Sequence, residues 1–372
     1  MLDHSLNNVH DALAIIGDAE WFEYSKAANP IRPSLSPEVP PKAFLPDLYA
    51  DGPTRLVPLD LSDKLRCSGP ATSPGLCANF ARILAGETLS PDIAADAATS
   101  QVFYVIRGSG RTRAVRGKGT DLAWKKADVV ALPGGAAYHH KAGPDGAALY
   151  LVHDAPMLRH LGAAATSSRF EPIVYPAEET LRVLAEVAKS SEAANRSRIS
   201  VLLANTHFPE LRTITHVIWT MYGIVQPGSM QAPHRHQSVA LDFIPSCGPG
   251  SYTLLGRDID ANGQIVNPVR LDWVAGMAFV TPPGFWHAHF NEGDQPSYVL
   301  PIQDADLQTY LRSLEIRFTG GTHSLKPSPD AGGCGHSGMN PEKVASSFAR
   351  GDPFRRRVRD GRTAESPRGP TL

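Results

Sequence analysis

The chain has 372 residues, 42% of which are hydrophobic, and a formal net charge of −1 at pH 7. This length allows two domains that each have a core of ordinary size, while the balanced charge argues against binding nucleic acid or an anionic membrane surface through a charged face. No run approaches about eighteen uninterrupted apolar residues, and no basic segment followed by an apolar one opens the sequence, so we expect a soluble, cytoplasmic protein without membrane contact.

Residues 1–54 are predicted to form an N-terminal arm. An apolar and aromatic segment from Val9 to Tyr24 is typical of a helix, and a proline-rich, extended stretch follows it. We expect this arm to pack on the folded part of the chain or on a neighbouring subunit.

Residues 55–160 contain two patterns of a strand followed by a glycine turn, at 101–110 and 127–140. His139 and His140 are adjacent, so in a strand they point to opposite faces. Residues 91–100, which precede the first strand, contain no histidine. We therefore expect this half of the chain to support folding and assembly; the alternative is that His139 or His140 holds a metal with ligands from elsewhere in the chain.

Residues 161–204 are predicted to be a helical linker. Within it, residues 176–189 have acidic side chains early, a basic side chain late and apolar side chains at helical spacing. This arrangement favours a helix, because the charges complement its dipole and the apolar positions share one face.

Residues 205–318 contain four short apolar runs that are typical of strands, at 217–225, 251–255, 277–281 and 298–302. Four glycines separate these runs, where a positive φ or a close backbone approach is needed; they are Gly228, Gly248, Gly276 and Gly284. The leucines between Asp304 and Phe318 share one side of a helix, which predicts a flanking helix there.

Residues 319–372 are predicted to be a flexible tail. They are rich in Gly, Pro, Ser and Arg and hold few large apolar side chains. Burial of so little apolar surface does not offset the entropy of ordering the segment. We expect the tail to be dispensable for catalysis.

Four histidines in two pairs carry the candidate chemistry. His234 and His236 form the first pair, and His287 and His289 form the second, about fifty positions later. Side chains alternate along a strand with a period of two, so each pair shares a face. Three neutral imidazoles from adjacent strands make an open metal site, suited to iron, zinc, copper or nickel, that leaves positions for a substrate and O2.

The spacing around these histidines resembles the two signatures of the cupin family. The first signature begins at Gly228, continues through both histidines of the first pair and ends at Gly248, with Leu241 where a glutamate ligand often stands. The second begins at Gly276 and includes Pro282, Gly284, His287 and Asn291. The resemblance implies an all-β protein of two cupin barrels, or jelly rolls, with flanking helices.

The first half of the chain resembles a degenerate cupin. Tyr138 stands where the third metal ligand is expected. Cupins with one degenerate and one intact half resemble the group of gentisate, salicylate and 1-hydroxy-2-naphthoate dioxygenases. We therefore expect residues 55–160 to be the degenerate barrel and residues 205–318 the metal-binding barrel.

Residue roles follow from this resemblance. His234, His236 and His287 would hold Fe(II), or another divalent transition metal, and His289 would be an acid/base. Trp286 and Tyr222, with Phe285, would give an aromatic wall to the substrate pocket. The predicted substrate pocket also includes Gln237 and Asp304.

Asp242 departs from the dioxygenase group. That group places an arginine six residues after the second ligand histidine, where it pairs with the substrate carboxylate, and this chain has Asp242 there. Six is an even step, so Asp242 should share the ligand face and take part in the site. It would repel a carboxylate and favour a substrate with an amine, amide or hydroxyl, unless Arg235 or Arg257 neutralises it.

The resemblance implies a non-haem Fe(II) dioxygenase that cleaves a small hydroxylated or amino-substituted aromatic, or a related enolisable substrate, with O2. Two alternatives remain open: a metal-dependent isomerase or hydrolase, and a cupin that binds metal or a small molecule without catalysis. The expected partners are a small-molecule substrate and O2, in a homo-oligomer of two or four chains.

Overall fold

The computed structural model describes residues 36–90, 97–115, 121–191 and 198–319, together with Ala19, Trp21 and Tyr24. The chain divides into two compact units, Met1–Thr319 and Gly320–Leu372, and all of the second lies outside the described residues. The predicted tail lies outside the described residues, except for Thr319. So does most of the helix predicted between Val9 and Tyr24. Within the described part, no helix is long and apolar enough to cross a membrane.

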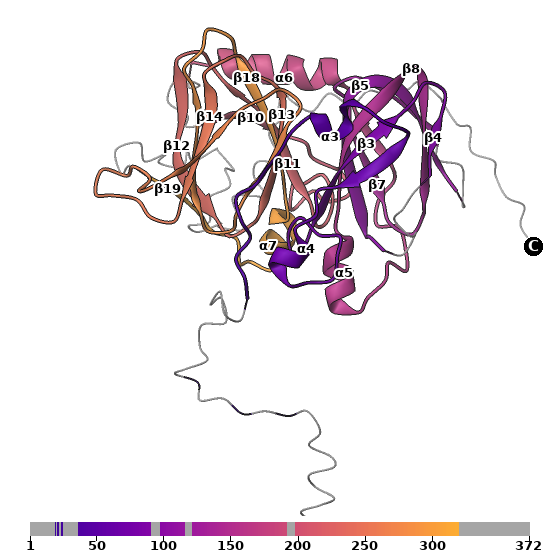
Figure 1. Ribbon diagram of the computed structural model, residues 1–372, viewed down its shortest axis with the longest axis horizontal. Coiled ribbons are helices and arrows are strands. Elements are labelled where there is room, and N and C mark those ends of the chain that lie inside the picture. Colours follow the sequence, from indigo (N-terminus) through magenta and orange to yellow (C-terminus); the bar gives the residue numbers. More distant parts are fainter. Residues whose placement is uncertain are drawn as a thin grey trace, which may run out of the picture. The chain divides into compact units, whose positions relative to one another are not determined.

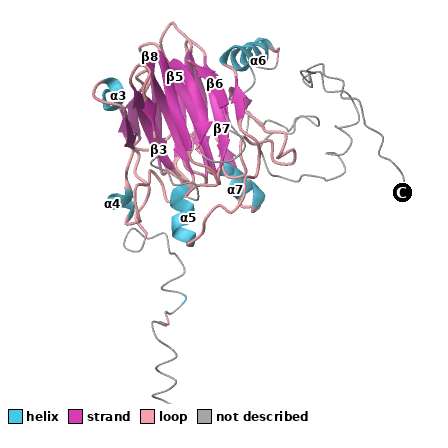
Figure 2. Cartoon of the chain, turned by 90° about the vertical axis from the view of Figure 1, so that its right-hand side faces the viewer, coloured by secondary structure: helices cyan, strands magenta, loops and turns pink. Residues whose placement is uncertain are grey.

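Strands dominate the first unit, as predicted (Figure 1). The N-terminal half forms one eight-stranded sheet in which β2, β3, β8, β5, β7 and β9 are neighbours in that order, while β4 pairs with β8 and β6 with β5. Figure 2 shows its central strands side by side. Their bounds are β2 Arg55–Pro58, β3 Cys77–Ile83, β4 Thr88–Leu89, β5 Ser100–Ala114, β6 Asp121–Lys125, β7 Val129–Pro133, β8 Tyr138–His153 and β9 Ile173–Tyr175.

The C-terminal half has two sheets. One has the order β1-β16-β13-β18-β11-β10, and the other has the order β15-β14-β17-β12-β19. The bounds are β1 Ala43–Phe44, β10 Ile199–Leu202, β11 Trp219–Val225, β12 Ser229–His236, β13 Ala240–Ser246, β14 Ser251–Gly256, β15 Val269–Asp272, β16 Ala278–Thr281, β17 Trp286–Asn291, β18 Ser297–Gln303 and β19 Ile316–Phe318. The four strands predicted here are confirmed as β11, β14, β16 and β18.

The described helices are short and flank the sheets; they are α3 Asp47–Ala50, α4 Ser62–Leu65, α5 Ala155–Leu161, α6 Ala177–Lys189 and α7 Ala305–Tyr310. The predicted helix at 176–189 is confirmed as α6. The predicted helix from Asp304 to Phe318 is wrong over its second part, because Arg312 has a left-handed φ of 61° and Ile316–Phe318 pair with β12 as a strand. Sheet pairing overrides the helical spacing of the leucines there.

The two predicted reasons for these glycines, positive φ and close approach, are both found. Gly228, Gly276 and Gly284 have positive φ, which a side chain would strain. Gly248 does not; a Cβ there would lie 3.2 Å from the Cβ of Gln295, so its role is close approach.

Part of the stretch before residue 54 packs on the C-terminal half. Ala43 and Phe44 pair with β16 as an added antiparallel strand, and the Tyr49 hydroxyl donates to the carbonyl of Gly276 at 3.0 Å. The predicted boundaries at residues 160 and 204 stay predictions, because residues 1–319 form one compact unit.

An aromatic cluster packs one face of β13 against the N-terminal half. The ring centroid of Phe243 lies 5.1 Å from that of Tyr104 and 4.9 Å from that of Tyr150. The Tyr150 hydroxyl donates to the carbonyl of Leu241 at 3.3 Å. Because this cluster is buried, it holds β13 in place, and side chains on the other face of β13 are free to line the interior of the C-terminal half.

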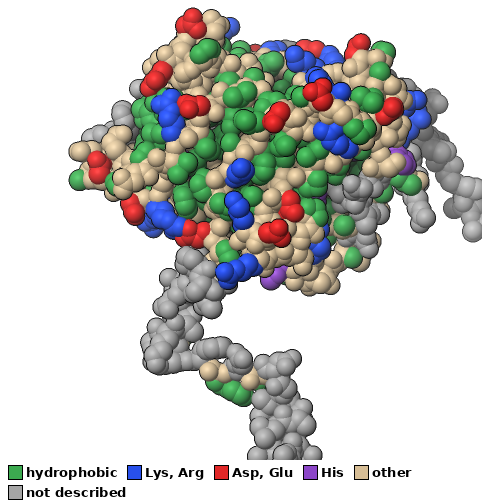
Figure 3. All heavy atoms as spheres, in the orientation of Figure 1, with side chains coloured by type: hydrophobic (Ala, Val, Ile, Leu, Met, Phe, Trp, Pro, Cys, Tyr) green, Lys and Arg blue, Asp and Glu red, His purple; other side chains and the backbone are tan. Residues whose placement is uncertain are grey.

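The surface is electrically mixed. On the face in Figure 3, basic and acidic side chains lie interspersed among hydrophobic ones. This distribution agrees with the net charge of −1 and gives this face no extended patch of one sign.

The buried carboxyl of Asp306 on α7 predicts a pH dependence of stability. Asp306 is 0% exposed, and burial raises its pKa from 3.8 to about 7. A raised folded-state pKa means that the neutral form stabilises the fold below about pH 4 and that this contribution is lost as the pH rises through 7. The free energy of unfolding of Asp306→Asn should therefore exceed that of wild type by a margin that grows from pH 5 to pH 8, by on the order of 1–3 kcal/mol.

Thermal unfolding at several pH values measures this margin. Asp258→Asn, a change at an exposed carboxyl, is the control and should track wild type. A margin that stays constant with pH would contradict the prediction.

Candidate functional site

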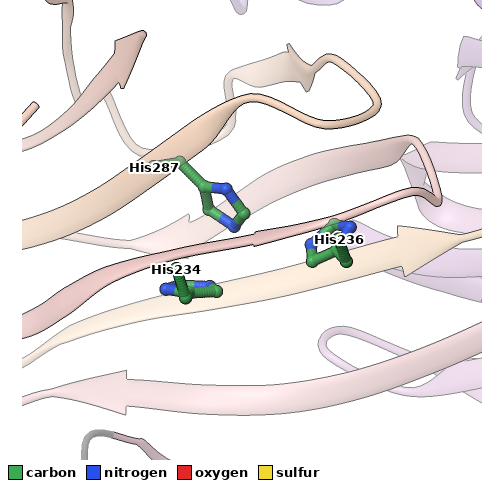
Figure 4. Close-up of side chains that lie close together, drawn as sticks. All are labelled: His234, His236 and His287. Atoms are coloured by element: carbon green, nitrogen blue, oxygen red, sulfur yellow. The ribbon is translucent and has the colours of Figure 1, made fainter. Parts of the chain in front are cut away.

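Two antiparallel strands bring three histidines together. His234 lies directly opposite His287 in the pairing of β12 with β17, and His236 shares the face of His234. The ring centroid of His287 lies 4.0 Å from that of His234 and 4.9 Å from that of His236. One ligand atom of each lies within 4.8 Å of the other two. Figure 4 shows His287 pointing from its strand toward the other pair.

Hydrogen bonds at Nδ1 direct the Nε2 atoms of these histidines inward. The Nδ1 of His234 lies 2.9 Å from the carbonyl of Ala232, and that of His287 lies 3.1 Å from the carbonyl of Phe285. The Nδ1 of His236 lies 2.9 Å from both the carbonyl and the hydroxyl of Ser238, and that hydroxyl donates its own hydrogen to Gln303. A carbonyl only accepts, so each Nδ1 carries the hydrogen and each neutral ring keeps its lone pair on Nε2.

The donor set fits a transition metal. Burial lowers the pKa of His234 and of His287 well below 6.5 and that of His236 to about 4, so all three are neutral ligands at pH 7. The Nε2 of His236 is buried and has no hydrogen-bond partner among the described residues. An unpaired buried acceptor is costly, and a metal ion at this position would satisfy it.

The fourth histidine has a different neighbour. His289 lies on the same face of β17 as His287, with ring centroids 5.8 Å apart. Its Nδ1 lies 2.8 Å from the hydroxyl of Thr253 on β14. Burial lowers its pKa to about 3, so its ring is neutral. It is not one of the three clustered histidines.

A pocket opens onto these histidines from between the two sheets of the C-terminal half. Its interior space, about 10 Å³, is room for about one water molecule, so an aromatic ring enters only when side chains move. The lining residues are Arg198, Ser200, Met221, Gln231, His234, Ala240, Asp242, His287, His289, Val299, Pro301 and Gln303.

Asp242 lines this pocket, as predicted, but not through its even spacing from His236: Asp242 lies on β13 of one sheet, whereas His236 ends β12 of the other. The hydroxyl of Thr281 donates to its carboxylate at 2.7 Å. Burial raises its pKa to about 7, and the Thr281 hydrogen bond and the Arg198 charge oppose that rise. The pocket therefore contains an acidic group and the guanidinium of Arg198 together.

Neither arginine that the sequence offered as a partner for Asp242 takes that role. The guanidinium of Arg235 lies 5.0 Å from the ring centroid of Trp286. That of Arg257 lies over Phe285 and pairs with Glu38. Arg198, at the start of β10, is the cation whose charge reaches Asp242.

Four predicted pocket residues lie outside the lining; they are Trp286, Tyr222, Gln237 and Asp304. Each is next in sequence to a residue of the site. Because side chains alternate along a strand, an error of one position moves the side chain to the opposite face. The neighbours that face the site are His287, Met221, His236 and Gln303.

The four misplaced residues have structural contacts of their own. Tyr222 packs against Tyr104 and Tyr298, between the halves of the chain. Gln237 is exposed and bonds to Glu315. Asp304 accepts a hydrogen bond from the backbone N–H of Val239 at 3.0 Å. Trp286 lies under Arg235, as described above.

Sequence reasoning missed eight lining residues; they are Arg198, Ser200, Met221, Gln231, Ala240, Val299, Pro301 and Gln303. Gln231 was detectable, because it precedes His234 on the same strand, although the pairing shifts register between them. Ser200 belongs to β10 and Arg198 directly precedes it. No motif connects this strand to the histidines, so nothing in the local sequence indicated either residue.

The described residues of the N-terminal half form no equivalent cluster of ligands. The Tyr138 hydroxyl donates to the carbonyl of Pro133 at 2.9 Å, and the Nδ1 of His140 lies 2.8 Å from the hydroxyl of Thr112. Among the described residues, the one cluster of potential metal ligands is that of His234, His236 and His287.

Comparisons with known proteins give relatives in one enzyme group. No family model matches the chain. Gentisate 1,2-dioxygenase 1 of Aquipseudomonas alcaligenes is 27% identical over 148 residues, which are 39% of each chain. Gentisate 1,2-dioxygenase of a Ralstonia species is 25% identical over 167 residues, 44% of each. The matches thus span less than half the length of these curated relatives.

The fold is shared more widely. The structure of salicylate 1,2-dioxygenase from Pseudaminobacter salicylatoxidans superposes with a TM-score of 0.61 at 12% identity, covering 85% of this chain and 99% of that one. Its adduct with gentisate gives the same TM-score at 13% identity, covering 86% and 96%. The chain is thus similar in sequence to gentisate dioxygenases over part of its length and shares the fold of the salicylate dioxygenase structure, which confirms the predicted fold class.

Proposed function

We propose that this protein is a non-haem Fe(II)-dependent dioxygenase that cleaves a small hydroxylated or amino-substituted aromatic with O2. The observation that carries the proposal is the cluster of three neutral, buried histidines, with the Nε2 of His236 unpaired, at the inner end of a pocket. The relatives, named for action on gentisate and salicylate, give the substrate class.

Iron follows from the ligand chemistry and the reaction. Three imidazoles accept several divalent metals, but zinc has no redox chemistry. When bound, Fe(II) would supply Lewis acidity and electrons for the reaction with O2. The protein's part is to present three lone pairs on one side of the ion and to leave the pocket side open.

The pocket residues orient the substrate and keep water out. Met221, Val299 and Pro301 provide apolar contacts for a ring. His289 lies where its ring can hydrogen-bond a substrate oxygen. Arg198 and Asp242 give opposite charges to the same wall, so a polar ring substituent has both a cation and an acid as potential partners.

Metal analysis and oxygen uptake test the proposal. Protein purified without air should contain about one iron per chain, and an oxygen electrode should record uptake when a hydroxylated aromatic is added. Metal-loaded protein that consumes no O2 with any such compound would contradict the proposal and favour a binding function. The predicted homo-oligomer and the cytoplasmic location stay predictions.

A further inference from the structure

A hydrogen-bonded chain of three side chains ends at His289. Thr253 on β14 lies opposite His289 in the strand pairing. Its hydroxyl accepts a hydrogen bond from the indole N–H of Trp273 at 2.8 Å and lies 2.8 Å from the Nδ1 of His289. Thr253 is 0% exposed, so solvent does not complete its hydrogen bonding.

Counting hydrogens along this chain assigns the tautomer of His289. An indole N–H only donates, so the Thr253 oxygen accepts from Trp273. The hydroxyl hydrogen of Thr253 then needs an acceptor, since buried polar groups are almost always paired. Among the described residues, its one remaining partner is the Nδ1 of His289. A neutral ring that accepts at Nδ1 carries its hydrogen on Nε2.

This tautomer is the reverse of the one in the three clustered histidines. There, Nδ1 donates to a backbone carbonyl and Nε2 has a lone pair. In His289, Nε2 carries a hydrogen and has no lone pair for a metal. Burial disfavours the charged form of all four rings, so the hydrogen-bond partner at Nδ1 separates ligand from hydrogen-bond donor.

We infer that Thr253 is a positioning residue: held by Trp273, it keeps a hydrogen on Nε2 of His289, which makes His289 a donor to a substrate oxygen and prevents it from becoming a fourth ligand. The role toward substrate rests on the proposed function, whereas the tautomer does not. A donor at this place would stabilise negative charge that develops on the substrate oxygen.

The N-terminal half repeats the same three side chains without a metal site. The indole N–H of Trp124 donates to the Thr112 hydroxyl at 2.9 Å, and that hydroxyl lies 2.8 Å from the Nδ1 of His140. Thr112 is 0% exposed and His140 is 3% exposed. This set of Trp124, Thr112 and His140 is a matched control, because a change there removes the same kind of buried contact away from the metal ligands.

Nitrogen-15 NMR of histidine side chains in the full-length, metal-free protein tests the tautomer directly. The signal that disappears in His289→Ala should show its hydrogen on Nε2 in wild type, and this preference should be lost in Thr253→Val. A hydrogen on Nδ1 of His289 in wild type would overturn the inference. If Thr253→Val does not fold, the wild-type spectrum still decides.

Kinetics test the role toward substrate. Thr253→Val should lower kcat by about 10- to 100-fold while KM and bound iron change less than about twofold, and Thr253→Ser should restore kcat. Thr112→Val should lower Tm by a similar amount and leave kcat unchanged. Equal kcat in the two valine variants would refute the positioning role. If no aromatic supports O2 uptake in wild type, the proposed function fails while the NMR result still stands on its own.

Discussion

Replacing any one of His234, His236 or His287 with alanine should remove the bound metal and reduce O2-dependent turnover by at least about 100-fold, with the fold preserved. Two imidazoles bind a divalent ion much less tightly than three, and loss of one opens the inner side of the ion to water. Each of the three side chains is at most 3% exposed. Removing one leaves a small polar space that water can fill, so the fold is preserved.

Metal content, turnover and circular dichroism of each variant measure these effects. His160→Ala is the control, because His160 is exposed on α5, and it should keep both metal and activity. Full iron content in any of the three site variants, or two metal ions per wild-type chain, would show that the ligand assignment is wrong.

Asp242→Asn should shift the substrate preference toward carboxylates. In wild type, the acid of Asp242 and the guanidinium of Arg198 act on the same pocket, and the acid offsets the attraction of the arginine for a substrate carboxylate. Asparagine keeps an acceptor for the Thr281 hydroxyl but removes the negative charge that Asp242 carries above about pH 7, where the comparison is made. We expect kcat/KM for a carboxylate-bearing aromatic, relative to its matched amide, to rise at least about tenfold.

The reverse change and a control make this test specific. Arg198→Gln should lower the same ratio, because it removes the cation. Asp272→Asn removes an acid whose side chain is 71% exposed and should leave the ratio unchanged. If wild type already prefers the carboxylate and Asp242→Asn changes nothing, the acid does not determine specificity.

The histidine cluster was predictable because its geometry depends on local sequence alone. Residues two apart on a strand share a face, so His234 and His236 had to point the same way once β12 was recognised. The repeated glycines mark the turns that start and end these strands. The remaining question, which of the four histidines bind metal, depends on the neighbours at Nδ1, and the partner of His289 comes from β14.

The rest of the pocket depends on pairing between distant strands. Trp286 and Tyr222 were placed one residue away from the true lining, because aromatic character does not reveal which face of a strand turns inward. Arg198 directly precedes β10, which joins the sheet by pairing with β11. At β19, the helical spacing of leucines lost to strand pairing next to His234 and His236.

Labelled oxygen gives the most direct test of the central claim that this site is a dioxygenase centre. Iron-loaded protein that turns over a hydroxylated aromatic under isotopically labelled O2 should yield a ring-cleaved product containing both atoms of one O2 molecule. The His234→Ala variant should yield none. A product that contains one labelled atom, or none, would contradict the account.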